Sequence, residues 1–353
     1  MNAATTLLDP AVLFFVLGAA AGLLRSNLAI PDQIARFLSL YLLMSVGLKG
    51  GFELAHGPLN AQVLGTLGLA MLLAVLVPLA GWLILRRWLP PMDALAVAAT
   101  YGSVSATTFI AASQYLAQVN MPHGGHMAVA LVLMESPAAL MAVLAATWLR
   151  SQAARSPVSA GLQSAGSATL ALGGGGRSSG AGAPAGPGRP SWAHLTREAL
   201  TDGAQLLLLG SLLIGLLTGE TGKAMMEPFS GALFKGMLSL FLMDMGLTVA
   251  RQWRGLADVP RSLLAYAVLA PLAHASLAIA LARWAGLPAG DAILLAVLAG
   301  SSSYIVVPAV LQQSLPEARP ALYLGMSLGV TFGFNILFGI PLYASVVSHL
   351  WGA

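Results

Sequence analysis

One apolar stretch of the sequence breaks into polar residues where a membrane helix would be expected to continue. After the apolar run 292–299, residues 300–304 read Gly-Ser-Ser-Ser-Tyr. Hydrocarbon offers no water to backbone N–H and C=O groups, so an unwound segment at membrane depth must be buried in protein or line a cavity. Unwinding exposes a half-helix N-terminus that attracts anions, and oxygens that can bind Na⁺. The stretch therefore predicts an ion site, with a proline kink at Pro308 as the alternative.

The first half of the chain repeats this pattern, which favours the ion site over the kink. Residues 102–105 read Gly-Ser-Val-Ser after another apolar run. At an offset of 198 residues, identical residue types recur in the pairs Asp93 and Asp291, Gly102 and Gly300, Ser103 and Ser301, and Ser105 and Ser303. Two interrupted apolar segments in corresponding positions are typical of the binding site of a secondary transporter.

The composition places the chain in a membrane. Hydrophobic residues make up 57% of it and charged residues 8%, against roughly a quarter charged in soluble domains. The net charge of +4 comes from basic residues scattered at segment ends, so no nucleic-acid partner is expected. The absence of cysteine excludes disulfides and thiolate metal sites.

Ten apolar segments predict the fold. They lie near residues 11–24, 34–48, 61–85, 92–117, 126–149, 203–219, 232–250, 262–282, 291–313 and 321–348. The region 151–200 is rich in Gly, Ala, Ser and Pro and is typical of a flexible linker. We therefore expect an all-α integral membrane protein of ten transmembrane helices in a lipid bilayer. Residues 1–150 and 201–353 would form two inverted five-helix repeats, with discontinuous fourth and ninth helices.

Basic residues predict the orientation, because cytoplasmic loops collect Lys and Arg. With both termini outside and the linker cytoplasmic, 13 of the 17 basic residues fall in inner loops. When the five basic residues of the long linker are left out, eight basic residues still fall in inner loops and three, Lys49, Lys223 and Arg283, fall outside. The predicted location is the cell (inner) membrane.

Glu135 is the clearest candidate for ion chemistry inside the membrane. A charge at the bilayer centre costs about 2.5–3.5 kcal/mol, so an intramembrane carboxylate is functional by default. The alternative is a protonated or hydrogen-bonded structural Glu. Asp93 and Asp291 stand at segment starts, where an N-cap role explains them. Asp244 either packs against a neighbouring helix or faces a cavity.

The remaining motifs exclude several function classes. His123 and His126 flank two glycines, but no acidic or thiol residue stands near them to complete a metal site. The glycine run 173–176 lacks the Lys-Ser/Thr of a phosphate-binding loop. No nucleophile motif is present, so we expect neither an enzyme nor a cofactor. Any transport would be driven by an ion gradient or be downhill.

Several motifs in order along the chain resemble the sodium-dependent bicarbonate transporters first recognised in cyanobacteria. These motifs cover residues 46–51, 102–108, 135–138, 233–239, 270–274 and 301–303. The resemblance implies a gate domain of helices 1, 2, 6 and 7 and a mobile core of the other six. It also implies a homotrimer and, in some members, a cytoplasmic regulator related to the PII signalling proteins.

The resemblance also implies a binding site between the broken helices, with Na⁺ as coupling ion. The bicarbonate contacts would come from Gly102, Ser103, Val104, Ser105, Ser301, Ser302 and Ser303. The sodium ligands would come from Ser105, Thr107, Glu135, Ser302 and Ser303. The chain departs from the family pattern at Tyr304 and at Glu135, where aspartates are expected. Loss of one carboxylate at 304 would weaken a Na⁺ site or change its stoichiometry.

The function predicted is secondary active import of a small anion, expected to be bicarbonate, by Na⁺ symport through alternating access. One alternative is a proton- or sodium-coupled carrier of another small organic anion, with Glu135 as the proton site. Another is a membrane sensor that binds the anion without transporting it. An intramembrane enzyme would need a second carboxylate or a metal-binding pair at helical spacing, which the sequence lacks.

Overall fold

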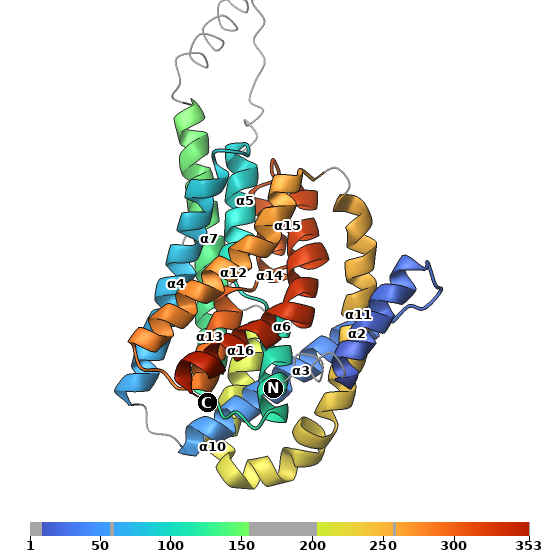
Figure 1. The fold of residues 1–353 in the computed structure, drawn as a ribbon, viewed down its shortest axis with the longest axis vertical. Coiled ribbons are helices and arrows are strands. Elements are labelled where there is room, and N and C mark those ends of the chain that lie inside the picture. Colours follow the sequence, from blue (N-terminus) through green and yellow to red (C-terminus); the bar gives the residue numbers. More distant parts are fainter. Residues whose placement is uncertain (1–8, 57–59, 155–202, 257–258, 353) are drawn as a thin grey trace, which may run out of the picture.

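The computed structural model describes residues 9–56, 60–154, 203–256 and 259–352, so the predicted linker lies outside the described residues beyond Ala154. Within these ranges the chain is helical and contains no strand (Figure 1). The longer helices are α2 (Pro10–Leu23), α3 (Asp32–His56), α4 (Ala61–Leu85), α5 (Pro91–Gly102), α6 (Ala106–Gln118), α7 (His126–Ala154), α10 (Gly203–Met226), α11 (Phe234–Trp253), α12 (Arg261–Trp284), α13 (Ala289–Ala299), α14 (Val306–Ser314), α15 (Pro320–Met326) and α16 (Ile340–Trp351). Three short π-helices, η1 (Glu227–Ala232), η3 (Ser327–Phe332) and η4 (Asn335–Gly339), and one 3-10 helix, η2 (Arg254–Leu256), complete the described elements.

Seven stretches of the described chain are long and apolar enough to cross a membrane. They are Asp32–Ala55, Ala61–Leu85, Pro91–Gln118, His126–Arg150, Gly203–Trp253, Arg261–Trp284 and Pro320–Trp351. There are seven such stretches and not the ten expected, because Gly203–Trp253 contains two predicted segments, and α2 and α13 are each too short to cross a membrane alone. The ten-helix inverted repeat therefore stays a prediction at this level.

Four helices, α2, α3, α10 and α11, form one group held together by glycines. α2 packs along α11 and α3 along α10. A side chain built on Gly18 would lie 2.0 Å from the carbonyl oxygen of Met243, and one on Gly51 would lie 2.1 Å from that of Leu212. Small residues at such interfaces let helix backbones approach closely in a membrane. Each pair joins a helix from the first half of the chain to one from the second.

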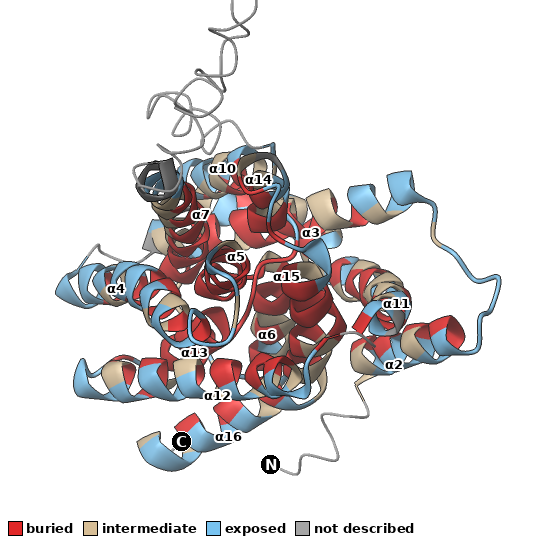
Figure 2. Cartoon of the chain, turned by 90° about the horizontal axis from the view of Figure 1, so that it is seen from above, coloured by how far each residue is buried: buried red, intermediate tan, exposed pale blue. Residues whose placement is uncertain are grey.

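The second group contains α4 to α7 and α12 to α16. Within it, α5 and α13 are the central helices: every residue is buried over 93–102 and over 290–304 (Figure 2). A helix that is apolar on all sides is buried either in protein or in lipid, and here protein surrounds both helices. The packing neighbours of α5 include α4 and α7, and those of α13 include α12 and α16.

Both predicted helix breaks are present, at the middle of this second group. α5 ends at Gly102 and α6 begins at Ala106, while α13 ends at Ala299 and α14 begins at Val306. A Cβ on Gly102 would lie 2.3 Å from Cβ of Pro78 in α4, so only glycine fits at the end of α5. The predicted end of the second segment at residue 48 is wrong, because α3 continues to His56.

Candidate ion-binding site

A cavity lies where the two helix breaks face α3 and α10. Its empty volume is about 610 Å³, part of it open to solvent. The polar residues that line it are Ser39, Ser105, Thr107, Glu135, Gln205, Ser303 and Tyr304. Val104, Ala106, Ile305 and Val306 also contribute, together with apolar residues of α3 and α10. The walls therefore come from both helix groups.

Two helix N-termini point their first turns at this cavity. Ala106 and Thr107 begin α6, and Val306 begins α14. The first N–H groups of a helix have no acceptor within it, and the helix dipole adds partial positive charge at this end. This arrangement provides a positive potential from backbone groups alone, which suits a small anion.

The two breaks are tied to each other by backbone hydrogen bonds. The N–H of Ser105 donates to Oγ of Ser301 at 3.0 Å, and the N–H of Ser303 donates to the carbonyl of Thr100 at 2.9 Å. Oγ of Ser301 in turn donates to the carbonyl of Leu298 at 2.8 Å. These contacts satisfy polar groups that the unwound segments would otherwise leave unpaired in the membrane.

A chain of buried hydroxyls crosses the cavity wall. Oγ of Ser105 caps α6 by accepting from the N–H of Thr108 at 3.2 Å, and it lies 3.0 Å from Oγ1 of Thr107. The hydroxyl of Thr107 is hydrogen-bonded to that of Tyr304. The Tyr304 ring packs edge-on against Phe332 at 5.3 Å between centroids. Three neutral oxygens thus cluster at one side of the cavity, the ligand type that hard cations prefer.

Glu135 supplies the carboxylate of the cavity. It is buried in α7, and its Oε2 accepts a hydrogen bond from Nε2 of Gln205 in α10 at 3.2 Å. The carbonyl of Glu135 also accepts from Oγ of Ser103 at 2.9 Å. Sequence reasoning missed Gln205, although a single amide in the apolar run 203–219 was a usable signal. The carboxylate therefore connects the two helix groups across the cavity.

The match to known families agrees with this geometry. The family model described as Na⁺-dependent bicarbonate transporter superfamily matches residues 10–348, which include both helix breaks and Glu135. The chain belongs to this superfamily. A comparison with curated proteins finds no match. The family predicted from the sequence motifs is confirmed, and membership makes the chain a multi-pass membrane protein of a transporter family rather than of an enzyme family.

The predicted site residues of this bicarbonate transporter superfamily member fall into two sets. Val104, Ser105, Thr107, Glu135 and Ser303 line the cavity. The others are not among its lining residues, namely Gly102, Ser103, Ser301 and Ser302. Oγ of Ser302 donates to Oγ of Ser327 at 3.0 Å, and this hydrogen bond holds the second helix break against the start of η3. The predicted bicarbonate and sodium contacts of both sets stay predictions.

The N-cap role predicted for Asp93 and Asp291 is wrong. The caps of α5 and α13 are Pro90 and Pro288, and both aspartates lie in the first turn with side chains turned to other segments. Asp93 accepts from the backbone N–H and the Nε of Arg319 at 2.8 and 2.9 Å.

Asp291 makes the corresponding contact at the start of α13. Its Oδ1 accepts from the N–H of Gly124 at 2.7 Å, and its Oδ2 lies 3.4 Å from Nε2 of His126. Each aspartate thus joins the start of a broken helix to the segment that precedes a helix of the opposite half. We call these contacts the two aspartate clamps.

A third contact ties the end of α7 to the loop before α15. Nε and Nη2 of Arg150 donate to the two carboxylate oxygens of Glu317 at 2.9 and 2.7 Å. These hydrogen bonds hold the pKa of Glu317 below its ordinary value. Because both side chains are nearly half exposed, the pair contributes at most about 1 kcal/mol.

Proposed function

We propose that the chain is a secondary transporter of the cell (inner) membrane that imports bicarbonate together with Na⁺ by alternating access. The observation that carries the proposal is the convergence of two helix N-termini, three hydroxyls and the Glu135 carboxylate on one cavity. Membership of the Na⁺-dependent bicarbonate transporter superfamily supports both the solute and the coupling ion.

The cavity chemistry supports binding of both ions together. Backbone N–H groups at the starts of α6 and α14 would bind the anion beside Val104 and Ser105. Oxygens of Thr107, Tyr304 and Glu135 would bind Na⁺. Opposite charges in a poorly solvated cavity attract strongly, so binding of one ion favours binding of the other. This mutual preference would couple the two fluxes.

The arrangement of helices supports alternating access. One wall of the cavity belongs to α3 and α10 and the other to the helix breaks, so movement of one group against the other would open the cavity. We infer that α2, α3, α10 and α11 are the gate and the remaining helices the core. The pairing of helices across the two halves, and the breaks at corresponding positions, support ten helices in two inverted repeats.

The surface supports a lipid environment and the proposed orientation. Large apolar side chains are exposed on α4 and α10, among them Leu64, Leu72, Ile214 and Leu217. α7 and α16 end at opposite ends of the molecule (Figure 1), as both termini outside and a cytoplasmic linker require. The homotrimer and a PII-like regulator stay predictions from the resemblance.

Uptake of ¹⁴C-bicarbonate into proteoliposomes tests the proposed function. An inward Na⁺ gradient is expected to stimulate initial uptake several-fold over an equal K⁺ gradient, with empty liposomes as the blank. Uptake driven by a pH gradient without Na⁺ would instead support the proton-coupled carrier. Saturable binding without flux would support the sensor.

Tyr304→Phe is expected to weaken Na⁺ binding selectively. The variant keeps the ring against Phe332 but loses the hydroxyl that bonds Thr107. One neutral hydrogen-bonding oxygen contributes roughly 1 kcal/mol, so the Na⁺ concentration for half-maximal uptake should rise about fivefold. Tyr41→Phe is the matched control, because that buried hydroxyl bonds the carbonyl of Phe229 away from the cavity. Equal effects of both variants would argue against a Na⁺ ligand at Tyr304.

A further inference from the structure

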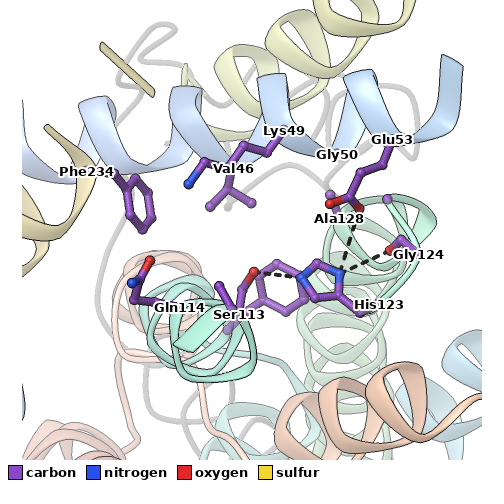
Figure 3. Close-up of a pocket in the computed structure, with 13 residues that line it drawn as sticks. Val46, Lys49, Gly50, Glu53, Ser113, Gln114, His123, Gly124, Ala128 and Phe234 are labelled. Carbon is purple, nitrogen blue, oxygen red and sulfur yellow. Dashed lines mark hydrogen bonds and ion pairs between the residues drawn. The ribbon is translucent and has the colours of Figure 1, made fainter. Parts of the chain in front are cut away.

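A second cavity lies along the same boundary between the two helix groups. α3 and α11 form one side, and α6, α7 and the loop before α7 form the other (Figure 3). Its empty volume is about 520 Å³, part of it open to solvent. We call it the outer cavity, because the proposed orientation places this end outside the cell.

The outer cavity and the ion-binding cavity follow each other along two shared helices. On α3, Leu43 lines the ion-binding cavity and Val46 lines the outer cavity. On α6, Thr107 lines the ion-binding cavity and Phe109 lines the outer cavity. Three residues of helix rise by only about 4.5 Å. Val46 and Phe109 are both buried, so one layer of apolar side chains separates the cavities.

Lys49 places a positive charge on the α3 wall of the outer cavity. Its Nζ lies 4.0 Å from the centroid of the Phe234 ring, and among the described residues it has no carboxylate within ion-pair distance. Ser113 and Gln114 lie opposite, on α6 (Figure 3). An ammonium group facing a hydroxyl and an amide is suited to a small oxyanion.

The acidic group of the outer cavity has a different partner. Oε2 of Glu53 lies 3.9 Å from Nδ1 of His123, whose Nε2 is hydrogen-bonded to Oγ of Ser113 at 3.0 Å. Figure 3 shows Glu53 turned to His123, one helical turn from Lys49. The negative charge of Glu53 therefore sits at the His123 side of the cavity, and Lys49 interacts with the carboxylates of Glu227 and Glu53 only beyond ion-pair distance.

We propose that the outer cavity is an access site for a small monovalent oxyanion, which Lys49 holds before the anion passes Val46 and Phe109 to the ion-binding cavity. The inference rests on the proposed function for the identity of this anion as bicarbonate. A positive group at a cavity mouth raises the local anion concentration and the association rate. Lys49 would therefore act on the concentration dependence of uptake rather than on its maximal rate.

Kinetics of ¹⁴C-bicarbonate uptake test this role of Lys49. Lys49→Gln is expected to raise the apparent KM about five- to tenfold, an effect that shrinks at high ionic strength because salt screens the charge. Lys49→Arg should stay near the unmodified protein, and Glu53→Gln should lower the KM. Arg283→Gln is the control, since Arg283 lies over the Trp351 ring and does not line the cavity. An increase of KM in both Lys49→Gln and Glu53→Gln, or in neither, would overturn the proposal.

A second readout does not depend on transport. The natural chain has no cysteine, so Ala117→Cys introduces a single thiol on the α6 wall of the cavity without removing a polar group. Bicarbonate is expected to slow its modification by a thiol reagent at least threefold, and to lose this effect in the Ala117→Cys, Lys49→Gln double variant. Protection without uptake by the unmodified protein would support the outer site and contradict the proposed function. Uptake without protection would contradict the outer site alone.

Discussion

Glu135→Gln is expected to reduce Na⁺-stimulated bicarbonate uptake by about 30-fold or more, since truncating one member of a buried charge pair costs roughly 2–5 kcal/mol. The variant keeps the size and planarity of the side chain, so the contact with Gln205 and the packing of α7 should survive. What it removes is the negative charge that offsets Na⁺ in the cavity. The variant should fold and enter the membrane, but its bicarbonate uptake should no longer be coupled to Na⁺.

The measurement is initial uptake in proteoliposomes over a range of Na⁺ concentrations, with protein content determined in the same vesicles. Glu220→Gln is the matched control, because it neutralises an exposed carboxylate of α10 that lies outside both cavities. A loss of pH-driven uptake with Na⁺ dependence intact would favour the proton-coupled carrier. Unchanged Na⁺ stimulation in Glu135→Gln would exclude Glu135 as the Na⁺ counter-charge.

The helix breaks could be predicted from the sequence because their cause is local. Glycine and consecutive serines interrupt an apolar run, and Ser105 caps the helix that follows it. The end of α3 could not be predicted in the same way. Gly51 is in the interior of α3 because it packs against the backbone of α10, and Lys49 extends into a cavity. A membrane helix tolerates both features once a close partner is present.

The hydrogen-bonding partners of the charged and polar groups could not be predicted from the sequence, because these partners lie far away along the chain. Asp93 contacts a residue 226 positions away, Asp291 one 167 positions away, and Glu135 one 70 positions away. The local rule for an aspartate at a helix start predicts capping, and it fails here because a tertiary partner satisfies the carboxylate better. Such pairings follow from the way the two halves of the chain interlock.

Asp93→Ala is expected to destabilise the protein by roughly 1–3 kcal/mol, the cost of leaving a donor without its acceptor. The substitution leaves the N–H and the guanidinium of Arg319 without their acceptor. Arg319→Gln should cost at least as much, because it leaves the buried Asp93 carboxylate without its cation, whereas the Arg319 guanidinium is 62% exposed and can be solvated when Asp93 is removed. The measurement is the thermal unfolding midpoint of the detergent-solubilised protein, with Asp32→Ala at the exposed start of α3 as control.

Asp291→Ala should show the same effect at the opposite clamp, where Gly124 and His126 lose their partner. Each clamp fixes the start of a broken helix against the other half of the chain, so both variants should also disturb the cavity where the breaks meet. We therefore expect lower Na⁺-stimulated uptake together with the lower midpoint. A midpoint like that of Asp32→Ala in either variant would show that the clamp does not stabilise the fold, and lost uptake at an unchanged midpoint would indicate a direct role in transport.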